Sequence, residues 1–248
     1  MVQFDENQVS ALEGNFKSGT FVKKYLFYRV ESRKLTVKVS ESIGSVSALI
    51  IEPEKMKCLM ILAHGAGAGM GHQFMESLAK QLAEHSIGTF RFNFPFTENA
   101  KKRPDPAPVA EKTISAVWQK ASELFPKVPL LAAGKSFGGR MSSHVLSKSP
   151  LPFIKGVVFF GFPLHAPGQP SISRADHLQS VPVPMLFLQG TRDALADLKL
   201  MQQVTGGLKA ATLVKFDGAD HSFKAGKNVV IPELAEATSK WINDLRIK

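Results

Sequence analysis

One serine in this sequence lies in a setting that could make it a nucleophile. Ser136 is the centre of the pentapeptide Gly134-Lys-Ser-Phe-Gly138, between an apolar run at 130–133 and a stretch of helical periodicity at 139–147. A sharp strand-to-helix turn strains the backbone at its centre, and side chains at the flanking positions would clash, which explains the two glycines. The following helix would point free N–H groups at the hydroxyl. The pattern predicts a nucleophile elbow, with an ordinary glycine-rich turn as the alternative.

A serine hydroxyl needs a neighbouring base before it can attack a carbonyl carbon, and His221 is the best placed of the seven histidines. It follows the last predicted strand, 212–216. Asp193 follows the preceding predicted strand, 185–188, and its charge would fix the imidazole tautomer and stabilise the imidazolium. The chain order Ser, Asp, His places all three on loops at the carboxyl ends of strands. The sequence therefore predicts a catalytic triad of Ser136, Asp193 and His221.

Other acids and histidines near these positions have competing or simpler interpretations. Asp197, one helical turn after Asp193, and Asp176, in the preceding loop, are the rival acids. Asp220 adjoins His221 and would point away from it, so we interpret Asp220 as structural. Four further histidines are expected to pack, to lie at the surface or to reach only the mouth of the site: His85, His144, His165 and His177.

A second glycine-rich segment, His64-Gly-Ala-Gly-Ala-Gly69, follows a wholly apolar predicted strand at 58–63. A loop in this place supplies one backbone N–H to an oxyanion hole, and the residue after the nucleophile supplies the other. We expect the donors to be the N–H groups of Ala66 and Phe137, with Gly67 close to Ala66 and His64 holding the loop. A phosphate-binding loop is the alternative, but the segment lacks the G-x-G-x-x-G spacing and the P-loop lysine.

The pocket expected around the serine has four candidate lining residues, namely Gly67, His72, Lys135 and Arg140. Lys135 and Arg140 flank the elbow and could attract an anionic substrate or serve the structure, and the sequence leaves both interpretations open. No two histidines fall at i and i+4, and no cluster of cysteines or carboxylates has metal-ligand spacing. We therefore expect neither a metal nor another cofactor.

Apolar strands alternate with amphipathic helices along the chain, which predicts an α/β fold with a mostly parallel sheet and helices on both faces. Strands are expected at 21–30, 34–39, 45–51, 58–63, 89–94, 130–133, 157–160, 185–188 and 212–216, and helices at 74–84, 109–125, 139–147, 195–204 and 233–245. The first three strands should form an antiparallel edge, and 97–108 a proline-rich surface loop. The roughly 25 residues before the strand at 185 leave room for little or no lid.

Composition limits the class of protein. At 248 residues, with 44% hydrophobic and 21% charged residues, the chain can bury one sizeable core, and we expect a single domain over residues 1–248. It lacks a run of about 18 apolar residues and a signal-peptide pattern, which favours a cytoplasmic protein without membrane contact. The net charge of +10 is scattered apart from Lys101-Lys102-Arg103, and no nucleic-acid-binding motif accompanies it, so no nucleic-acid partner is expected. The lone Cys58 should be a buried, inert thiol.

With these residues, the chain resembles α/β hydrolases of the dienelactone-hydrolase-like group. It resembles more closely the branch of testis-expressed and NSL chromatin-complex subunit relatives and uncharacterised bacterial hydrolases. Five segments carry the resemblance: HGAGAG at 64–69, RFNFP at 91–95, GKSFGGR at 134–140, GTRD at 190–193 and GADHSF at 218–223. It implies the α/β-hydrolase fold with a Ser-Asp-His triad. Dienelactone hydrolase itself has a cysteine nucleophile where this chain has Ser136, so its substrate is not carried over.

Three functions are open on this reasoning. The leading hypothesis is hydrolysis of a carboxylic ester or thioester of a small molecule through an acyl-enzyme. One alternative is a peptidase or amidase of small substrates. The other is a non-catalytic interaction module on a hydrolase scaffold, as the chromatin-complex relatives suggest, because a fold does not guarantee activity. The presence of all three triad residues favours catalysis.

Overall fold

The computed structural model describes residues 32–245, and these residues build a central sheet of eight strands in the order β1-β2-β4-β3-β5-β6-β7-β8. The strands are β1 (Ser32–Ser40), β2 (Gly44–Ile51), β3 (Cys58–Ala63), β4 (Ile87–Phe92), β5 (Leu130–Lys135), β6 (Ile154–Phe160), β7 (Met185–Gly190) and β8 (Ala211–Phe216). The strand expected at 21–30 lies outside the described residues.

The sheet is antiparallel at its N-terminal edge and parallel elsewhere. β1 pairs with β2 and β2 with β4 in antiparallel fashion, whereas every pair from β4 to β8 is parallel. This confirms the predicted α/β-hydrolase architecture. In the register of β3, Ala63 lies opposite Phe92 of β4 and Gly134 of β5. The carboxyl ends of these strands therefore lie side by side, so the loops that follow them meet at one edge.

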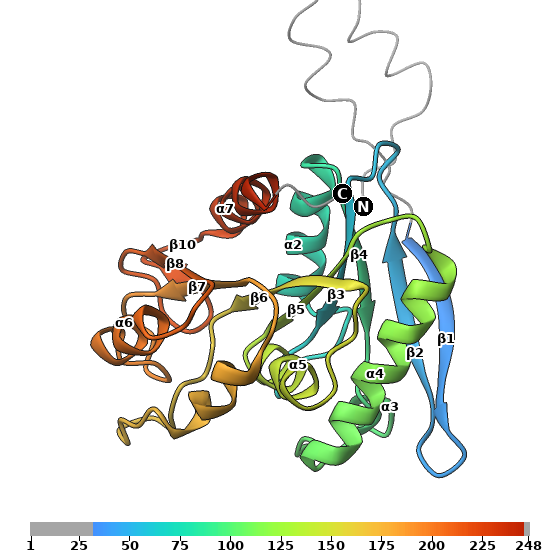
Figure 1. Ribbon diagram of the computed structural model, residues 1–248, viewed down its shortest axis with the longest axis horizontal. Helices are drawn as coiled ribbons and strands as arrows, with labels where there is room; N and C mark the ends of the chain where they lie inside the picture. Colours follow the sequence, from blue (N-terminus) through green and yellow to red (C-terminus); the bar gives the residue numbers. More distant parts are fainter. Residues whose placement is uncertain (1–31, 246–248) are drawn as a thin grey trace, which may run out of the picture.

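Helices cover both faces of the sheet. Figure 1 shows α2 (Gln73–Glu84) and α7 (Ile231–Asp244) on one face, and α4 (Ala107–Leu124), α5 (Phe137–Lys148) and α6 (Leu198–Gly206) on the other. Each face has its own apolar core, with Leu78 and Trp241 in one and Trp118 and Met141 in the other. None of the described helices is both long and apolar enough to cross a membrane.

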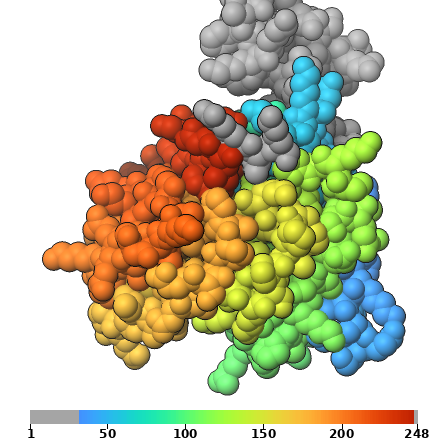
Figure 2. Space-filling view, in the orientation of Figure 1, coloured from blue at the N-terminus to red at the C-terminus, as the bar shows by residue number. Residues whose placement is uncertain are grey.

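The strand order sets the overall layout of the described residues. In the space-filling view, the colours run from blue at the β1 end to orange at the β8 end, so neighbouring segments of sequence are mostly neighbours in space (Figure 2). The segment between β6 and β7 folds back against α5 through a 3-10 helix, η2 (Ser173–Ser180). Within residues 32–245 no lid is inserted there, as the short segment predicts.

Three local features differ from the sequence-based expectation. A short helix, α3 (Pro95–Glu98), replaces the start of the loop expected at 97–108, because Pro95 suits a first helical position. Helix α6 begins at Leu198 and not at Leu195, because Asp197 caps it by accepting a hydrogen bond from the N–H of Leu200. A small hairpin follows β8, made of the strands β9 (Lys224–Ala225) and β10 (Asn228–Val229).

Candidate active site

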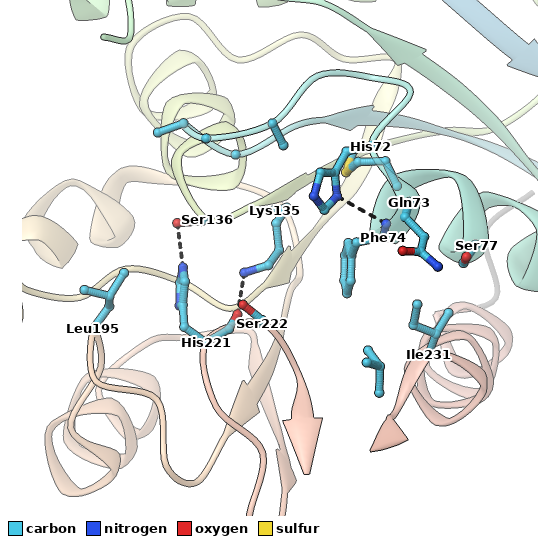
Figure 3. Close-up of a pocket in the computed structure, with 16 residues that line it drawn as sticks. His72, Gln73, Phe74, Ser77, Lys135, Ser136, Leu195, His221, Ser222 and Ile231 are labelled. Atoms are coloured by element: carbon cyan, nitrogen blue, oxygen red, sulfur yellow. Dashed lines mark hydrogen bonds between the residues drawn. The ribbon is translucent and has the colours of Figure 1, made fainter. Parts of the chain in front are cut away.

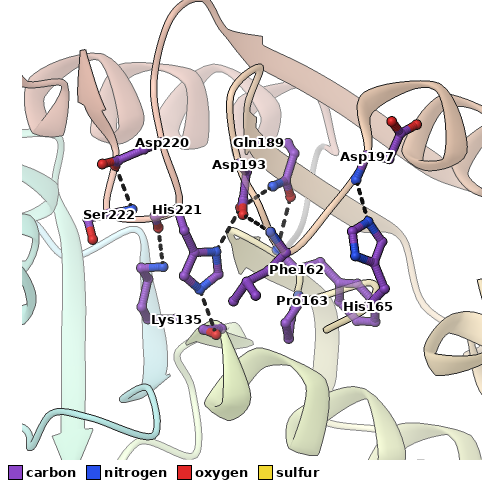
Figure 4. Close-up of polar contacts among 12 residues, drawn as sticks. Lys135, Phe162, Pro163, His165, Gln189, Asp193, Asp197, Asp220, His221 and Ser222 are labelled. Atoms are coloured by element: carbon purple, nitrogen blue, oxygen red, sulfur yellow. Dashed lines mark hydrogen bonds and ion pairs between the residues drawn. The ribbon is translucent and has the colours of Figure 1, made fainter. Parts of the chain in front are cut away.

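Three side chains from different loops form a continuous line of hydrogen bonds at the carboxyl edge of the sheet. His221 Nε2 lies 2.9 Å from Ser136 Oγ (Figure 3), and His221 Nδ1 lies 2.7 Å from Asp193 Oδ2 (Figure 4). The Asp193 side chain is fully buried, whereas that of His221 remains 25% exposed. The structure thus brings together the serine, base and acid predicted from the sequence.

The backbone at Ser136 has the strain expected of an elbow. Its φ is 50° and its ψ is −114°, a combination that a residue with a side chain rarely adopts. The turn also requires close packing, because a Cβ atom at Gly138 would lie 2.6 Å from the carbonyl oxygen of Ala63. β5 ends at Lys135 and α5 begins at Phe137, so the serine occupies the single residue between strand and helix.

Asp193 is held by two groups besides His221. The N–H of Leu195 donates to Asp193 Oδ1 at 2.8 Å, and Gln189 Nε2 donates to Asp193 Oδ2 at 2.5 Å. Gln189 is fully buried at the end of β7, and its Oε1 accepts from the N–H of Phe162 at 3.1 Å. Every oxygen of the carboxylate is therefore bonded, which fixes its orientation toward the imidazole. Gln189 was not predicted from the sequence, although a polar residue near the end of an apolar strand is a signal.

The glycine loop after β3 begins with a buried histidine. His64 Nδ1 lies 2.8 Å from the carbonyl oxygen of Gly65, and Nε2 accepts a hydrogen bond from the N–H of Phe94 at 3.1 Å. Burial lowers the pKa of His64 to about 4, so the imidazole is neutral at pH 7, with Nδ1–H as donor and Nε2 as acceptor. His64 therefore ties the loop to the segment after β4, as predicted.

Two further residues from β4 and its end hold the far side of the same loop. Asn93 Oδ1 accepts from the N–H of Met70 at 2.8 Å, and Arg91 Nη1 donates to the Met70 carbonyl oxygen at 2.9 Å. Arg91 is only 2% exposed. Both residues lie in the motif RFNFP at 91–95, and neither role was predicted from the sequence.

The two expected oxyanion donors flank the serine. Phe137 is the first residue of α5, where N–H groups have no partner within the helix. On the other side, the loop runs against the elbow, because a Cβ atom at Gly65 would lie 3.7 Å from Ser136 Cβ. Ala66, the next residue, is exposed at the site. Backbone amides from two elements are thus available on either side of the hydroxyl.

A cavity of about 620 Å³ opens beside Ser136 (Figure 3). The glycine loop, the start of α2 and the hairpin after β8 form its walls, with apolar side chains that include Phe74, Leu195, Val229 and Ile231. Three of the four predicted lining residues contribute to it, namely Gly67, His72 and Lys135.

Arg140 is the exception, and its predicted place at the pocket is wrong. It is not among the residues that line the cavity. α5 carries it one turn away from the elbow, to the side that packs against η2, where Arg174 lies close enough to lower the pKa of Arg140 in addition to the effect of burial. His144 and His177 stack on each other in the same region, with their ring centroids 3.9 Å apart.

A comparison with known protein families shows what the chain is related to. Residues 56–242 match the family model described as an alpha/beta hydrolase domain. The chain belongs to the α/β-hydrolase family. Because the match covers all the loops that carry the Ser-His-Asp line, the arrangement described above lies entirely within the family's domain.

Solved structures show the same fold as this hydrolase. An alpha-beta serine hydrolase homologue from Coxiella burnetii aligns with a TM-score of 0.68 and 22% identity, covering 86% of this chain and 97% of that one. Dienelactone hydrolase from Anabaena variabilis aligns with a TM-score of 0.70 and 16% identity, covering 86% of this chain and 97% of that one. A serine hydrolase without a lid from Xanthomonas campestris aligns with a TM-score of 0.67 and 21% identity, covering 88% of this chain and 96% of that one.

The three other aspartates considered from the sequence lie outside the Ser-His-Asp line. Asp197 caps α6, and Asp176 lies exposed in η2. Asp220 Oδ1 accepts from the N–H groups of Ser222 and Lys224, which shapes the turn that carries His221. No hydrogen bond links any of these three carboxylates to the imidazole.

His165 and Cys58 also have positions that the structure explains. His165 Nε2 accepts from the N–H of Asp197 at 2.8 Å, so it supports the loop before α6. Cys58 is buried, and burial raises the pKa of its thiol to about 12. Among residues 32–245, no group of three or more histidine, cysteine or acidic side chains could hold a metal ion.

Proposed function

We propose that this α/β hydrolase cleaves a carboxylic ester or thioester of a small molecule through an acyl-enzyme. Ser136 is the nucleophile, His221 the base and Asp193 the acid that orients the base. The N–H groups of Ala66 and Phe137 form the oxyanion hole. The observation that carries the proposal is the unbroken line from Ser136 Oγ through the imidazole to the buried carboxylate, with distances of 2.9 and 2.7 Å.

In the acylation step, Ser136 Oγ attacks the carbonyl carbon while its proton passes to His221 Nε2. The carbonyl oxygen becomes an oxyanion, which the N–H groups of Ala66 and Phe137 stabilise as its charge develops. The bond from carbon to the leaving oxygen or sulfur then breaks, and the proton on Nε2 passes to the leaving group. Asp193 keeps the proton on Nδ1 throughout and stabilises the imidazolium.

In the deacylation step, a water molecule replaces the leaving group. His221 Nε2 takes a proton from the water as its oxygen attacks the acyl carbon, and the same oxyanion hole is used again. The bond to Ser136 Oγ breaks, and the proton on Nε2 returns to the serine. The cavity of about 620 Å³ suits a small substrate, because known ligand pockets range from roughly 300 to 1,000 Å³.

The comparisons support the class of reaction and not its substrate. Neighbours with the same fold are described as serine hydrolases, among them one without a lid. The narrower likeness to the branch of testis-expressed and NSL relatives stays a prediction that rests on the sequence motifs. A cytoplasmic location likewise stays a prediction.

Turnover of a substrate panel tests the proposal. Wild type should hydrolyse aryl esters or thioesters faster than the matched aminoacyl amides, and Ser136→Ala should remove this activity without changing the melting temperature, because the hydroxyl contributes little to packing. Preference for the amides would favour a small-substrate peptidase. Failure of the folded wild type on the whole panel would favour an interaction module. Ser136→Ala activity within tenfold of wild type would reject this nucleophile.

A further inference from the structure

The described residues that line the cavity beside Ser136 include a single lysine and no other residue of the charged types Lys, Arg, Asp and Glu. That lysine is Lys135. Leu131, Ala133 and Lys135 alternate along β5, and the first two pack in the core under α2 and α7. The same alternation directs Lys135 toward that face, where its ammonium lies between the start of α2 and the loop of His221 (Figure 3).

The ammonium of Lys135 is only partly satisfied by its protein neighbours. Nζ donates to the carbonyl oxygen of His221 at 2.6 Å. The rings of Phe223 and Phe74 lie near it, with centroids 5.4 and 5.9 Å from Nζ, which suits a cation–π contact. Within residues 32–245 no carboxylate forms an ion pair with it. An ammonium has three N–H donors, so two of them have no hydrogen-bond acceptor in the described protein.

The acids nearest to this lysine are already engaged elsewhere. Asp193 is bonded to His221, Gln189 and the N–H of Leu195. Asp220 accepts two backbone N–H groups of its own turn. Burial lowers the pKa of Lys135 to about 8, even though Asp193 and Asp220 oppose the shift. An uncompensated buried charge is costly, and such charges mark functional sites.

The helices that begin around the cavity add partial charges of the same sign as the charge of Lys135. α2 begins with Gln73 and α7 with Ile231, both in the lining, and α5 begins beside Ser136. The N-terminal end of a helix carries a partial positive charge. The acids in the first turns of α2 and α7 do not line the cavity: Glu76 pairs with Lys80, and Glu233 is exposed. The cavity is therefore positive on several sides.

We propose that Lys135 selects a substrate with a carboxylate close to the scissile ester or thioester, which makes the substrate a half-ester of a dicarboxylic acid or an ester of a hydroxy acid. The inference rests on the proposed hydrolase activity. A carboxylate supplies one negative charge for the one ammonium, and a phosphate dianion would call for more donors. The structure also separates Lys135 from Arg140, which the sequence treated alike, because only Lys135 lines the cavity.

Two pairs of esters that differ in charge test the inference. 4-Nitrophenyl valerate and mono-4-nitrophenyl glutarate place the charge on the acyl half, and acetoxyacetamide and acetoxyacetate place it on the alcohol half. The uncatalysed rates are subtracted. We expect wild type to have a kcat/KM about tenfold higher for the anionic member of at least one pair, the size of one charge-assisted hydrogen bond. Lys135→Met should abolish that preference, so that kcat/KM of the anionic member falls more than that of the neutral member, mainly through KM.

Lys227→Met is the matched control, because it removes an exposed charge from the adjacent hairpin without touching the lining. It should keep the preference. If Lys135→Met does not fold, wild type alone gives the answer: the preference should fade as the pH rises above about 8, where Lys135 loses its proton. Asp193, Asp220 and His221 also face this ammonium, so the comparison uses the ratio of the two esters in a pair, in which their contribution to the reaction itself is common to both members.

An equal loss on both members in Lys135→Met would overturn the inference and make Lys135 a residue that positions His221. No anionic preference of wild type in either pair would overturn it as well. If wild type turned over none of the four esters and did not react with a fluorophosphonate, the proposed hydrolase activity itself would fail.

Discussion

The loops on the two sides of Ser136 are held in different ways. The loops that carry Asp193 and His221 are joined by side chains, with an imidazole between a carboxylate and the serine hydroxyl. The glycine loop at 64–69 is held at the backbone of Met70, the residue that follows it, by the buried Arg91 and the half-buried Asn93. The first region sets which atoms carry protons, and the second sets where backbone N–H groups point.

This difference predicts that substitutions in the two regions have different effects on kcat and stability. A change in the acid loop alters the protonation of the base and should lower kcat by a large factor. A change behind the glycine loop should shift the N–H donors by a fraction of an ångström and lower kcat by a smaller factor. Changes to a buried neutral side chain such as His64 should act mainly on stability. The predictions below follow this order.

Asp193→Asn should have the largest effect, a loss of roughly 10⁴-fold in kcat. The carboxylate accepts from His221 and Gln189 at Oδ2 and from the N–H of Leu195 at Oδ1. Either orientation of an asparagine amide therefore points its NH₂ group at an N–H donor. The imidazole must then take the wrong tautomer or turn away. Steady-state kinetics on an aryl ester measures the loss.

Asp197→Asn and Asp176→Asn are the matched controls, because both carboxylates lie outside the hydrogen-bond line. Each should leave kcat within a few-fold of wild type. If either control lost as much as Asp193→Asn, the acid would have been assigned to the wrong loop.

Asn93→Ala should lower kcat by roughly 10- to 100-fold, a smaller factor than the removal of one oxyanion donor causes. KM should stay nearly unchanged. The variant removes the acceptor for the N–H of Met70 and frees the far end of the glycine loop. Asn99→Ala is the control, because Asn99 binds only the carbonyl oxygen of Pro95 in the neighbouring short helix. Equal activity of the two variants would show that the loop keeps its position without Asn93.

The smallest effect concerns stability at acid pH. The folded pKa of His64 is about 4, below its ordinary value of 6.5, so the unfolded chain binds the extra proton as the pH falls from 6.5 to 4. Stability is complete above pH 6.5 and decreases through this window. His64 alone should remove about 2 kcal/mol from the free energy of unfolding between pH 7.5 and pH 5.

Urea unfolding of wild type and His64→Asn at the two pH values measures this contribution. The variant cannot take up the proton and should lose less stability on acidification. Equal losses would mean that His64 is not buried in its neutral form. His177, whose folded pKa is also lowered to about 4, contributes equally to both proteins and cancels.

The sequence predicted those parts of the site that depend on local pattern. The elbow was predictable because strand, glycines, serine and helix are contiguous, and His221 because it ends the last strand of the parallel sheet. The supports of the glycine loop were not, since Arg91 and Asn93 meet Met70 across more than twenty residues of sequence. No local pattern reports such contacts.

Helix phase and loop structure explain the other differences. Arg140 lies four residues after Ser136, and the sequence did not show that the helix turns it toward η2 and away from the cavity. Gln189 was missed because a polar residue at a strand end has many possible partners. The β9–β10 hairpin, whose Val229 lines the cavity, was missed because two-residue strands carry too little periodicity.

Covalent labelling of Ser136 is the most direct measurement of the proposed activity, because it requires no knowledge of the substrate. When Ser136 Oγ attacks a fluorophosphonate, fluoride leaves and negative charge builds up on the phosphoryl oxygen, so the reaction needs an activated nucleophile and N–H donors placed at that oxygen. We expect one adduct on wild type, mapped to Ser136 by mass spectrometry of peptides, and strongly reduced labelling of His221→Ala. A folded wild type that stays unlabelled, or an adduct on another serine, would contradict the assignment.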